Sequence, residues 1–370
     1  MIDSAPTASQ PLPAAAAPAA QTGPVSLVLV GCGAVSRLFY LPALREIARH
    51  GLARTVAVVD PVAAARDELA AALGARAFAD LPSALAAGGE LAVLATPPRF
   101  HREQAEACFA AGFDVLCEKP LAPTAAEAGA IAAAAVRTGR LLAAGHYKRF
   151  MPAHRALRHL IEHGTFGPLR SVAIAEGGKF SWPAATDSFF RREQTPGGVL
   201  LDIGVHVLDL LLWWLGEPAE FAYADDARDG LEANCLLTAR YASGVRAEVR
   251  LSRDWKTANT YVFRFERATV HCRVNASNHL ELTLDGLPMT FAAELRDPLP
   301  PRAAAPTAAL ETNAQAFIAQ LVDVCAAVRE RRPPFVTGTS AAAAVRWIEA
   351  CYARRQPLAE PWQTPADDQA

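Results

Sequence analysis

Three polar side chains in an otherwise apolar stretch could take part in chemistry. Between Gly197 and Gly216 the sequence predicts a buried helix, because apolar residues cover every face of it. Asp202, His206 and Asp209 stand at i, i+4 and i+7, which places them on one side of that helix. Buried carboxylates and imidazoles must be partnered or must line a cavity. The stripe therefore indicates either a paired structural set or an acid–base site.

A glycine-rich turn follows the first apolar run, residues 26–30, which is typical of a strand buried on both faces. The first glycine of the turn permits a sharp bend, and the second lets backbone N–H groups approach a pyrophosphate at a helix N-terminus. Ser36 takes the third position of this fingerprint as a small residue. The pattern predicts a dinucleotide site formed by Gly31, Cys32, Gly33, Ala34 and Val35.

The second predicted strand, residues 55–60, ends in the acid Asp60. Its carboxylate can accept hydrogen bonds from an adenosine ribose and would repel a 2′-phosphate, so NAD is favoured over NADP. Arg66 leaves NADP open, because a nearby arginine can accommodate the phosphate. Asp60 could also cap the helix that starts at Pro61, a role compatible with ribose binding.

Strands and helices alternate through the rest of the first half. Short apolar runs near residue 77 and at 91–95, 114–117 and 141–145 predict strands, with helices at 62–73, at 99–111 and from about 124. This order predicts a Rossmann-type α/β domain over residues 25–146, with a doubly wound parallel sheet of about six strands. Thr96, Pro97 and Pro98 stop one strand at its carboxyl end, where such sheets bind ligands.

Glu118 and Lys119 follow another strand at the same predicted edge. Lys119 could donate to a substrate oxygen and stabilise alkoxide charge. Glu118 could accept a hydrogen bond from the hydroxyl of the nicotinamide ribose. On spacing alone, a solvated turn explains this charged pair equally well.

The second half predicts a different α/β domain, over residues 147–355. A helix at 152–163 and a strand at 169–176 come first, and a run of adjacent strands follows residue 216. Apolar and polar residues alternate over 245–252, which predicts an open, mostly antiparallel sheet with one polar face, suited to an oligomer contact. Helices are predicted at 310–331 and 341–355, and loose tails at 1–24, which is rich in Ala and Pro, and at 356–370.

The composition narrows the class of protein. With 370 residues, 52% of them hydrophobic and 20% charged, the chain is expected to form two soluble domains. A net charge of −2 gives no reason to expect nucleic acid or an anionic membrane as a partner. Residues 1–24 lack the basic start of an export signal, and the seven cysteines show neither paired nor zinc-ligand spacing. A cytoplasmic protein without a bound metal is expected.

Residues 25 to about 355 resemble the glucose–fructose oxidoreductase / inositol dehydrogenase / MocA (Gfo/Idh/MocA) family. The matching stretches are Gly31-Cys32-Gly33-Ala34, Ala95-Thr96-Pro97-Pro98, Cys117-Glu118-Lys119-Pro120-Leu121, Tyr147-Lys148-Arg149-Phe150 and the segment from Gly197 to His206. The resemblance implies a Rossmann domain followed by an open-sheet domain, commonly in a homodimer or homotetramer. It also implies that Lys119, Asp202 and His206 form the active site.

The activity that the resemblance implies is hydride transfer between NAD and a secondary hydroxyl of a sugar, cyclitol or sugar derivative. His206 would act as the general base, since the usual pKa of histidine suits that work near neutrality. Asp202 would orient the substrate and tune His206, while Lys119 would stabilise the alkoxide and hold the cofactor ribose. Asp209 is expected to be structural.

Further side chains are expected around the site. His101 is a candidate for the cofactor pocket, and Lys148, Arg149 and Trp182 are candidates for substrate binding, although the two cations could equally be surface charges. The loop 179–196 either selects the substrate or makes an oligomer contact, and its aromatic and basic residues are Phe180, Trp182, Phe189, Phe190, Arg191 and Arg192. Two alternatives stay open: an NAD-dependent glycoside hydrolase, and a non-catalytic NAD- or ligand-binding protein on the same fold.

Overall fold

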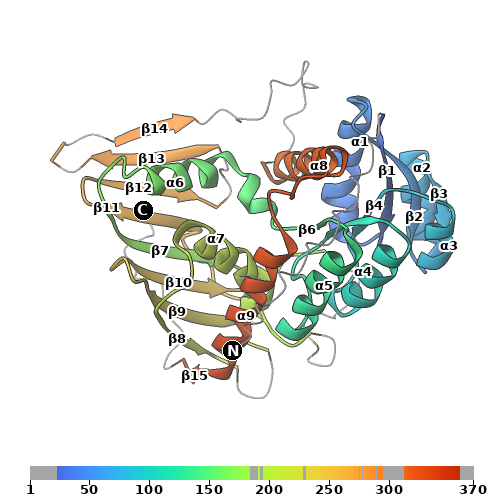
Figure 1. Ribbon diagram of the computed structural model, residues 1–370. Helices are drawn as coiled ribbons and strands as arrows, with labels where there is room; N and C mark the ends of the chain where they lie inside the picture. Colours follow the sequence, from blue (N-terminus) through green and yellow to red (C-terminus); the bar gives the residue numbers. More distant parts are fainter. Residues whose placement is uncertain are drawn as a thin grey trace, which may run out of the picture.

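The computed structural model describes residues 23–183, 191, 195–227, 231–274, 276, 278–284, 286–287, 290–294 and 312–358. Its elements form two sheets with helices packed against them and between them (Figure 1). Within these ranges no helix combines the length and the apolar composition needed to cross a membrane.

The first sheet is parallel and has six strands in the order β3-β2-β1-β4-β5-β6. The central strands are fully buried because helices cover both faces. This arrangement confirms the predicted doubly wound Rossmann sheet. Its strands are β1 (Val25–Val30), β2 (Ala53–Val59), β3 (Arg76–Phe78), β4 (Leu91–Leu94), β5 (Asp114–Cys117) and β6 (Leu142–Ala144).

The helices of this half follow the strands in alternation. In α5 (Ala125–Thr138), the side chain of Thr124 caps the start by accepting the N–H of Glu127, and Gly139 ends the helix in a left-handed conformation. The single helix expected after the glycine turn opens with a π-helical segment, η1 (Ser36–Tyr40). The others are α1 (Leu41–Arg49), α2 (Ala63–Leu73), α3 (Leu81–Ala86), η2 (Pro98–Phe100), α4 (His101–Ala110) and α5 (Ala125–Thr138).

Within the described part of the chain, the second sheet has nine strands in the order β14-β13-β12-β11-β7-β10-β9-β8-β15. Most neighbours are antiparallel, as predicted, but β10 runs parallel to β7 and β15 parallel to β8. The strands are β7 (Leu169–Gly177), β8 (Glu220–Asp225), β9 (Asn234–Arg240), β10 (Arg246–Ser252), β11 (Thr260–Phe265), β12 (Ala268–Arg273), β13 (His279–Leu284), β14 (Thr290–Glu294) and β15 (Gln356–Pro357). The sequence did not predict the last two, and β15 lies in the segment expected to be loose.

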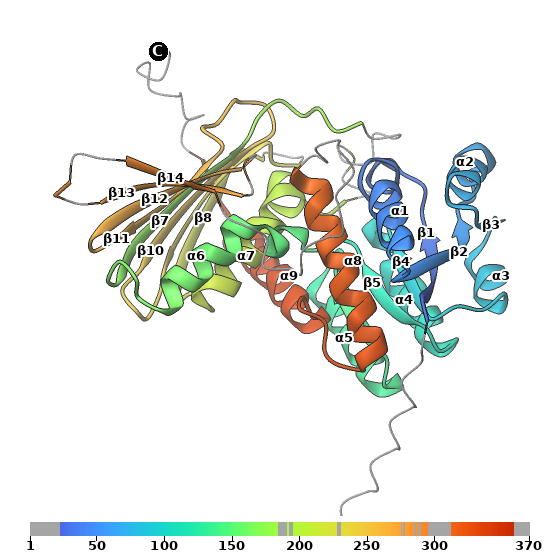
Figure 2. The ribbon, with the colours of Figure 1, turned by 90° about the horizontal axis from the view of Figure 1, so that it is seen from above.

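Helices cover one face of this sheet (Figure 2). They are α6 (Pro152–Glu162) and α7 (Val205–Leu215), preceded by the short η3 (Tyr147–Phe150) and η5 (Leu200–Gly204) respectively. The apolar positions of β10, such as Val249 and Leu251, pack against them, whereas its exposed positions form the opposite face. The apolar positions of the alternating pattern predicted over 245–252 thus belong to the core between the sheet and α7.

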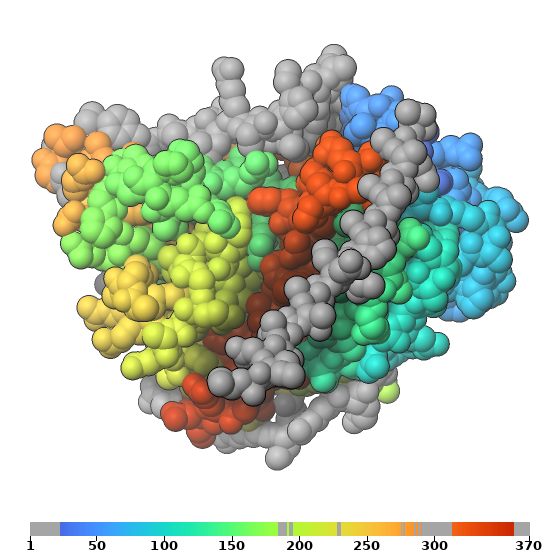
Figure 3. All heavy atoms as spheres, in the orientation of Figure 1, coloured from blue at the N-terminus to red at the C-terminus, as the bar shows by residue number. Residues whose placement is uncertain are grey.

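Two C-terminal helices, α8 (Thr312–Glu330) and α9 (Gly338–Ala353), lie between the two sheets. In Figure 3 their orange to red atoms form a band between the two halves. Phe317, Ile318 and Leu321 of α8 belong to the core that contains β1 and α1. The chain therefore returns to the first half after β14, before β15 adds the last strand to the second sheet. The predicted domain boundary, which places α8 in the second domain, stays a prediction.

Candidate active site

The helix expected to carry the polar stripe begins with a π-helical segment, η5, and continues as α7. Asp202 lies in η5 and is half-buried, whereas His206 lies in the first turn of α7 and is buried. π-Helical segments are rare and often mark functional sites. Both side chains stand where the second half faces the first, since Lys119 from the end of β5 reaches Asp202.

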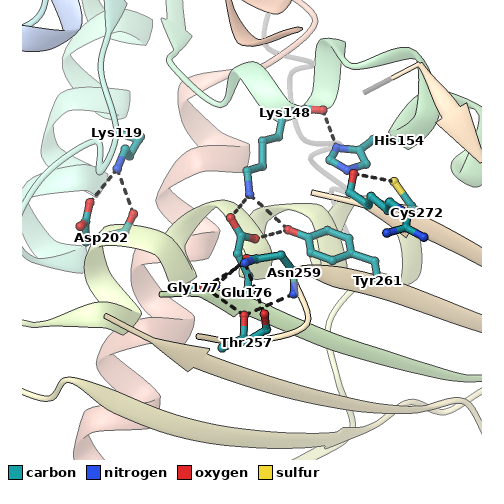
Figure 4. A network of polar contacts seen from close by, with 11 residues as sticks. Lys119, Lys148, His154, Glu176, Gly177, Asp202, Thr257, Asn259, Tyr261 and Cys272 are labelled. Atoms are coloured by element: carbon teal, nitrogen blue, oxygen red, sulfur yellow. Dashed lines mark hydrogen bonds and ion pairs between the residues drawn. The ribbon is translucent and has the colours of Figure 1, made fainter. Parts of the chain in front are cut away.

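Lys119 and Asp202 form one of the contacts that join the two halves (Figure 4). The Nζ atom of Lys119 donates to the carbonyl oxygen of Asp202 at 2.9 Å and to its Oδ1 atom at 3.1 Å. Arg253, just after β10, donates from Nη2 to Oδ2 of the same carboxylate at 3.2 Å. An ammonium group has three donors, so these two bonds leave one N–H of Lys119 for another acceptor.

His206 has an apolar and aromatic setting. Its ring meets Tyr147 edge-on at 5.0 Å between ring centroids and His146 at 5.9 Å. Its Nδ1 atom is buried without a hydrogen-bond partner in the described structure. Burial, together with the positive charges of Lys119 and Lys148, lowers the pKa of His206 well below its usual value. The ordinary pKa assumed from the sequence therefore does not apply, and this imidazole is neutral at pH 7.

Glu118 is buried beside Lys119 and receives two hydrogen bonds. The hydroxyl of Tyr40, from η1, donates to its Oε1 at 2.7 Å, and the backbone N–H of Lys119 donates to its Oε2 at 3.0 Å. Burial raises the pKa of Glu118, and these hydrogen bonds oppose that rise. Gln320 of α8 contacts the same hydroxyl at 3.4 Å, so α8 helps to hold the turn that carries Lys119.

The glycine turn after β1 fits a dinucleotide. Gly31 is buried with φ of +96°, and a Cβ there would lie 2.6 Å from the carbonyl oxygen of Ala95. Gly33 is exposed, and among the described residues a Cβ there would meet no neighbouring atom within 4 Å. The first N–H groups of the following helix have no intrahelical acceptor. Open space in front of free backbone donors suits a pyrophosphate, with Ala34 and Val35 in the first turn.

Asp60 lies at the end of β2, beside the same turn. Its Oδ2 accepts the N–H of Cys32 at 2.8 Å, and its Oδ1 accepts the N–H of Val62 at 2.8 Å. The carboxylate therefore joins the glycine turn to the start of α2, whose N-cap position is Val62 rather than Asp60. Burial raises the pKa of the Cys32 thiol to about 12, with the charge of Asp60 as the next cause.

The loops after β4 and β5 are joined by His101. Its Nε2 lies 2.8 Å from the carbonyl oxygen of Thr96, and its Nδ1 lies 3.1 Å from that of Pro120. His101 is fully buried, whereas Pro97 is exposed and Pro98 half-buried at the sheet edge. His101 thus holds the two loops at this edge of the sheet together, and a contact of its ring with the cofactor stays a prediction.

Comparison with protein-family models gives two matches. Residues 25–146 match the oxidoreductase family with an NAD-binding Rossmann fold, and residues 154–274 match the GFO/IDH/MocA C-terminal domain. The chain belongs to the Gfo/Idh/MocA family. It is an oxidoreductase with an NAD-binding domain, which confirms the family, the cofactor and the enzyme class expected from the sequence.

Curated relatives and solved structures agree with this family. The chain is 38% identical over 257 residues to a putative UDP-kanosamine synthase oxidoreductase subunit of Amycolatopsis mediterranei, covering 69% of each protein. It is 34% identical over 204 residues to an inositol 2-dehydrogenase of Leifsonia xyli, covering 53% of this chain and 58% of that protein. A levoglucosan dehydrogenase in complex with NADH and levoglucosan has the same fold, with a TM-score of 0.78 and 18% identity over 89% of this chain and 96% of the other.

The two cations of the Tyr147–Phe150 segment are both paired in this Gfo/Idh/MocA chain. Lys148 donates to Oε1 of Glu176 at 2.6 Å and to the hydroxyl of Tyr261 at 3.2 Å. Figure 4 shows that this group of contacts is separate from the Lys119–Asp202 pair. Arg149 forms two hydrogen bonds to the carboxylate of Asp209, at 2.6 and 2.7 Å. Both pairs are buried, so they are not surface charges. Asp209 has the structural partner expected of it, and substrate contacts of the two cations stay a prediction.

Trp182 lies in the described part of the loop 179–196. Its ring stacks on Phe39 of η1 at 6.0 Å, and Phe39 stacks on Phe317 of α8 at 4.9 Å. Phe317 in turn stacks on Tyr147, the ring that contacts His206. Trp182 thus joins the second half to the helix after the glycine turn. Phe189, Phe190 and Arg192 lie outside the described residues.

Sequence reasoning missed two residues that contact the site. Arg253 binds Asp202, and Glu232 binds the backbone at the start of η5. The position of Arg253 at the end of a predicted strand was a signal, but nothing local joined it to Asp202. Within the described residues, no group of His, Cys, Asp and Glu is arranged to hold a metal ion.

Proposed function

We propose that this protein is an NAD-dependent dehydrogenase that oxidises a secondary hydroxyl of a sugar, cyclitol or sugar derivative, or reduces the corresponding carbonyl. The observation that carries the proposal is the contact of Lys119 with Asp202, one turn before the buried imidazole of His206. Relatives named as an inositol 2-dehydrogenase and a UDP-kanosamine synthase subunit support this substrate class. No relative named above is described as a glycoside hydrolase or a non-catalytic binding protein.

His206 is the proposed general base. It is neutral, and its buried Nδ1 leaves Nε2 as the nitrogen that accepts the hydroxyl proton. Lys119 directs its remaining N–H to the same substrate oxygen and stabilises the negative charge that develops there. Asp202 and Arg253 fix Lys119 through the carboxylate between them, which limits the reorganisation needed during the reaction.

NAD, when bound, supplies the acceptor for the hydride that leaves the substrate carbon. The proposed pocket consists of the glycine turn, the carboxylate of Asp60 and the edge formed by Thr96, Pro97 and Pro98, with Glu118 beside Lys119. Asp60 would favour NAD, because its negative charge would repel the 2′-phosphate of NADP. Trp182 is proposed to border the substrate.

The test is a screen of the purified protein for a change in NADH fluorescence. It uses NAD or NADP with polyols, aldoses, uronic acids and nucleotide sugars, and the Lys119→Ala variant is measured alongside. Turnover with one substrate class that is lost in the variant is the expected result. Tight NAD binding with no turnover on any member of the panel would contradict the dehydrogenase and favour a binding protein or a glycosidase.

We also propose that the protein is cytoplasmic and forms a homodimer or a homotetramer. The face of the nine-stranded sheet that no described helix covers exposes alternating charges such as Arg240, Arg246 and Glu248. All seven cysteines are free and buried, which suits a reducing compartment. Light scattering during gel filtration would measure the assembly, and a monomer at micromolar concentration would contradict it.

A further inference from the structure

A single buried glutamate, Glu232, holds the start of the helix that carries the site. Its Oε1 atom accepts the N–H of Gly198 at 2.9 Å and that of Leu200 at 3.0 Å. Its backbone carbonyl accepts the N–H of Val199 at 3.0 Å. Three successive donors of the first turn thus have one residue as their acceptor. A carboxylate at a helix N-terminus is also favoured by the helix dipole.

The glycine pair that precedes η5 makes this contact feasible. A Cβ on Gly198 would lie 2.0 Å from the carbonyl oxygen of Glu232, and a Cβ on Gly197 would lie 2.1 Å from the hydroxyl oxygen of Tyr352. Real Cβ atoms do not approach other atoms so closely, so any other residue would push the helix start away from Glu232 and Tyr352. The two glycines therefore allow the helix start to lie close to Glu232 and Tyr352, which their sequence pattern did not predict.

The end of helix α9 holds the glutamate in turn. The hydroxyl of Tyr352 donates to Oε1 of Glu232 at 2.7 Å, and Nη2 of Arg355 lies 3.7 Å from its Oε2. Arg355 also pairs with Asp225 at the end of β8, at 2.7 Å. Burial raises the pKa of Glu232, and the donors from Tyr352 and the helix start oppose that rise. The helix start and α9 therefore share Oε1 as their acceptor, whereas Oε2 is buried without a hydrogen-bond partner in the described structure and has the charge of Arg355 near it.

Helix α9 connects the two halves of the site. Ala342 and Val345 belong to the core of the first half, whereas Trp347 and Ile348 belong to the core that contains α7. Oε1 of Glu349 accepts the N–H of the first residue of α5, the helix after the turn that carries Lys119, at 2.8 Å. In Figure 1 and Figure 2, α9 lies between α5 and α7. One helix therefore contacts the supports of both partners in the Lys119–Asp202 pair.

We propose that Glu232 is a positioning residue, which, with Tyr352 and α9 behind it, sets Asp202 and His206 against Lys119. Glu232 acts through the helix start and contacts no reacting group. The inference rests on the proposed dehydrogenase function, because its effect is on the rate of that reaction. It predicts that displacing the helix start lowers kcat while the binding of NAD, which the first half provides, is unchanged.

The experiment compares four variants with the substrate found in the screen. Glu232→Ala removes the acceptor of two helix donors, and kcat is expected to fall about 10- to 100-fold, since small misplacement of catalytic groups has this effect. The Kd for NAD is expected to stay within about twofold of wild type, because the proposed pocket is formed by the first half and Glu232 belongs to the second. Glu232→Gln keeps an acceptor oxygen and should restore most of the rate. Tyr352→Phe removes one donor and should give an intermediate kcat.

Glu90→Ala is the matched control. Glu90 also accepts a backbone N–H, that of Ser26 at 2.8 Å, and pairs with Arg329, but at the far end of the first sheet. This variant should lower the melting temperature without changing kcat. If Glu232→Ala also lowers the melting temperature without changing kcat, Glu232 is structural only and the proposal is overturned. If Glu232→Ala does not fold, Tyr352→Phe is compared with Glu90→Ala instead, and an unchanged kcat in Tyr352→Phe overturns the proposal.

A second readout separates this proposal from the dehydrogenase function. Hydrogen exchange of the amides at 198–204 is measured in wild type and Glu232→Gln or Glu232→Ala, whichever variants fold. Faster exchange in Glu232→Ala than in Glu232→Gln is expected, whatever the substrate is. If the wild type turns over no substrate but exchange changes as expected, only the proposed function fails. Unchanged exchange overturns the positioning role.

Discussion

The ammonium group of Lys119 donates to both the carbonyl and the carboxylate of Asp202, 83 residues away along the chain. The pair is only partly shielded, with about one fifth of each side chain exposed, 22% for Lys119 and 21% for Asp202. We therefore expect a substrate oxygen to reach the remaining donor of Lys119 from the solvent side. The pair joins the two halves of the molecule at the point where the proposed reaction takes place.

Lys119→Ala is expected to lower kcat about 100- to 1,000-fold, the usual effect of removing one donor to a developing negative charge. The Kd for NAD should change little, since the glycine turn and Asp60 lie on other strands. Stopped-flow or steady-state NADH fluorescence measures the first quantity and fluorescence titration the second. Arg253→Met, which leaves Lys119 in place, should have a smaller effect on kcat. Equal activity of wild type and Lys119→Ala would remove Lys119 from the mechanism.

The low pKa of His206 predicts the pH dependence of oxidation. A neutral imidazole is the active form of the base, and a depressed pKa keeps it neutral as the pH falls below 6.5. In the free enzyme kcat/KM for the polyol substrate should therefore stay level from pH 8 to about pH 6, with no inflection near the ordinary histidine pKa of about 6.5. An inflection near 6.5 that disappears in His206→Gln would contradict the depressed pKa.

Buried neutral histidines also predict acid sensitivity of the fold. Burial lowers the pKa of His146 to about 4, and both its ring nitrogens lack hydrogen bonds in the described structure. Between the unfolded pKa of about 6.5 and this folded value, the unfolded chain binds more protons, so stability falls as the pH is lowered. The contribution is up to about 1.4 kcal/mol per pH unit for one group. His146→Phe should unfold in urea with a shallower dependence on pH between 6 and 4.5. An unchanged slope would show that His146 is not buried in its neutral form.

The sequence predicted the first sheet and the helix with Asp202 and His206, because both depend on local signals. Continuous apolar runs indicate buried parallel strands, and the apolar stretch indicates a helix, which the structure forms as η5 followed by α7. It did not predict Arg253 and Glu232, whose partners lie 51 and 34 residues away. Periodicity also shows which face of α8 is apolar, but not that Phe317 would join the core of the first sheet.

Asp60 is expected to set the preference for NAD. Asp60→Ser removes the negative charge beside the adenosine ribose and should reduce the ratio of kcat/KM for NAD over NADP at least about tenfold. The variant also loses the hydrogen bond from the N–H of Cys32, so its melting temperature is measured as well. Asp67→Asn is the control, because Asp67 is an exposed acid of α2 that pairs with Arg66. A similar change of the ratio in both variants would point to the general charge of this surface instead of Asp60.

The two glycines of the turn after β1 are expected to respond differently to alanine. At Gly31 a Cβ would lie 2.6 Å from the carbonyl oxygen of Ala95, in a left-handed conformation, so Gly31→Ala should destabilise the fold by about 1–3 kcal/mol. At Gly33 no atom of the described residues beyond the adjoining chain lies within 4 Å of the added Cβ, so Gly33→Ala should keep the stability of wild type. A methyl group there would face the proposed position of the pyrophosphate, and the Kd for NAD should rise about tenfold or more. Urea unfolding and NAD titration of both variants give the two quantities. If Gly33→Ala binds NAD as wild type does, the pyrophosphate does not lie on this turn.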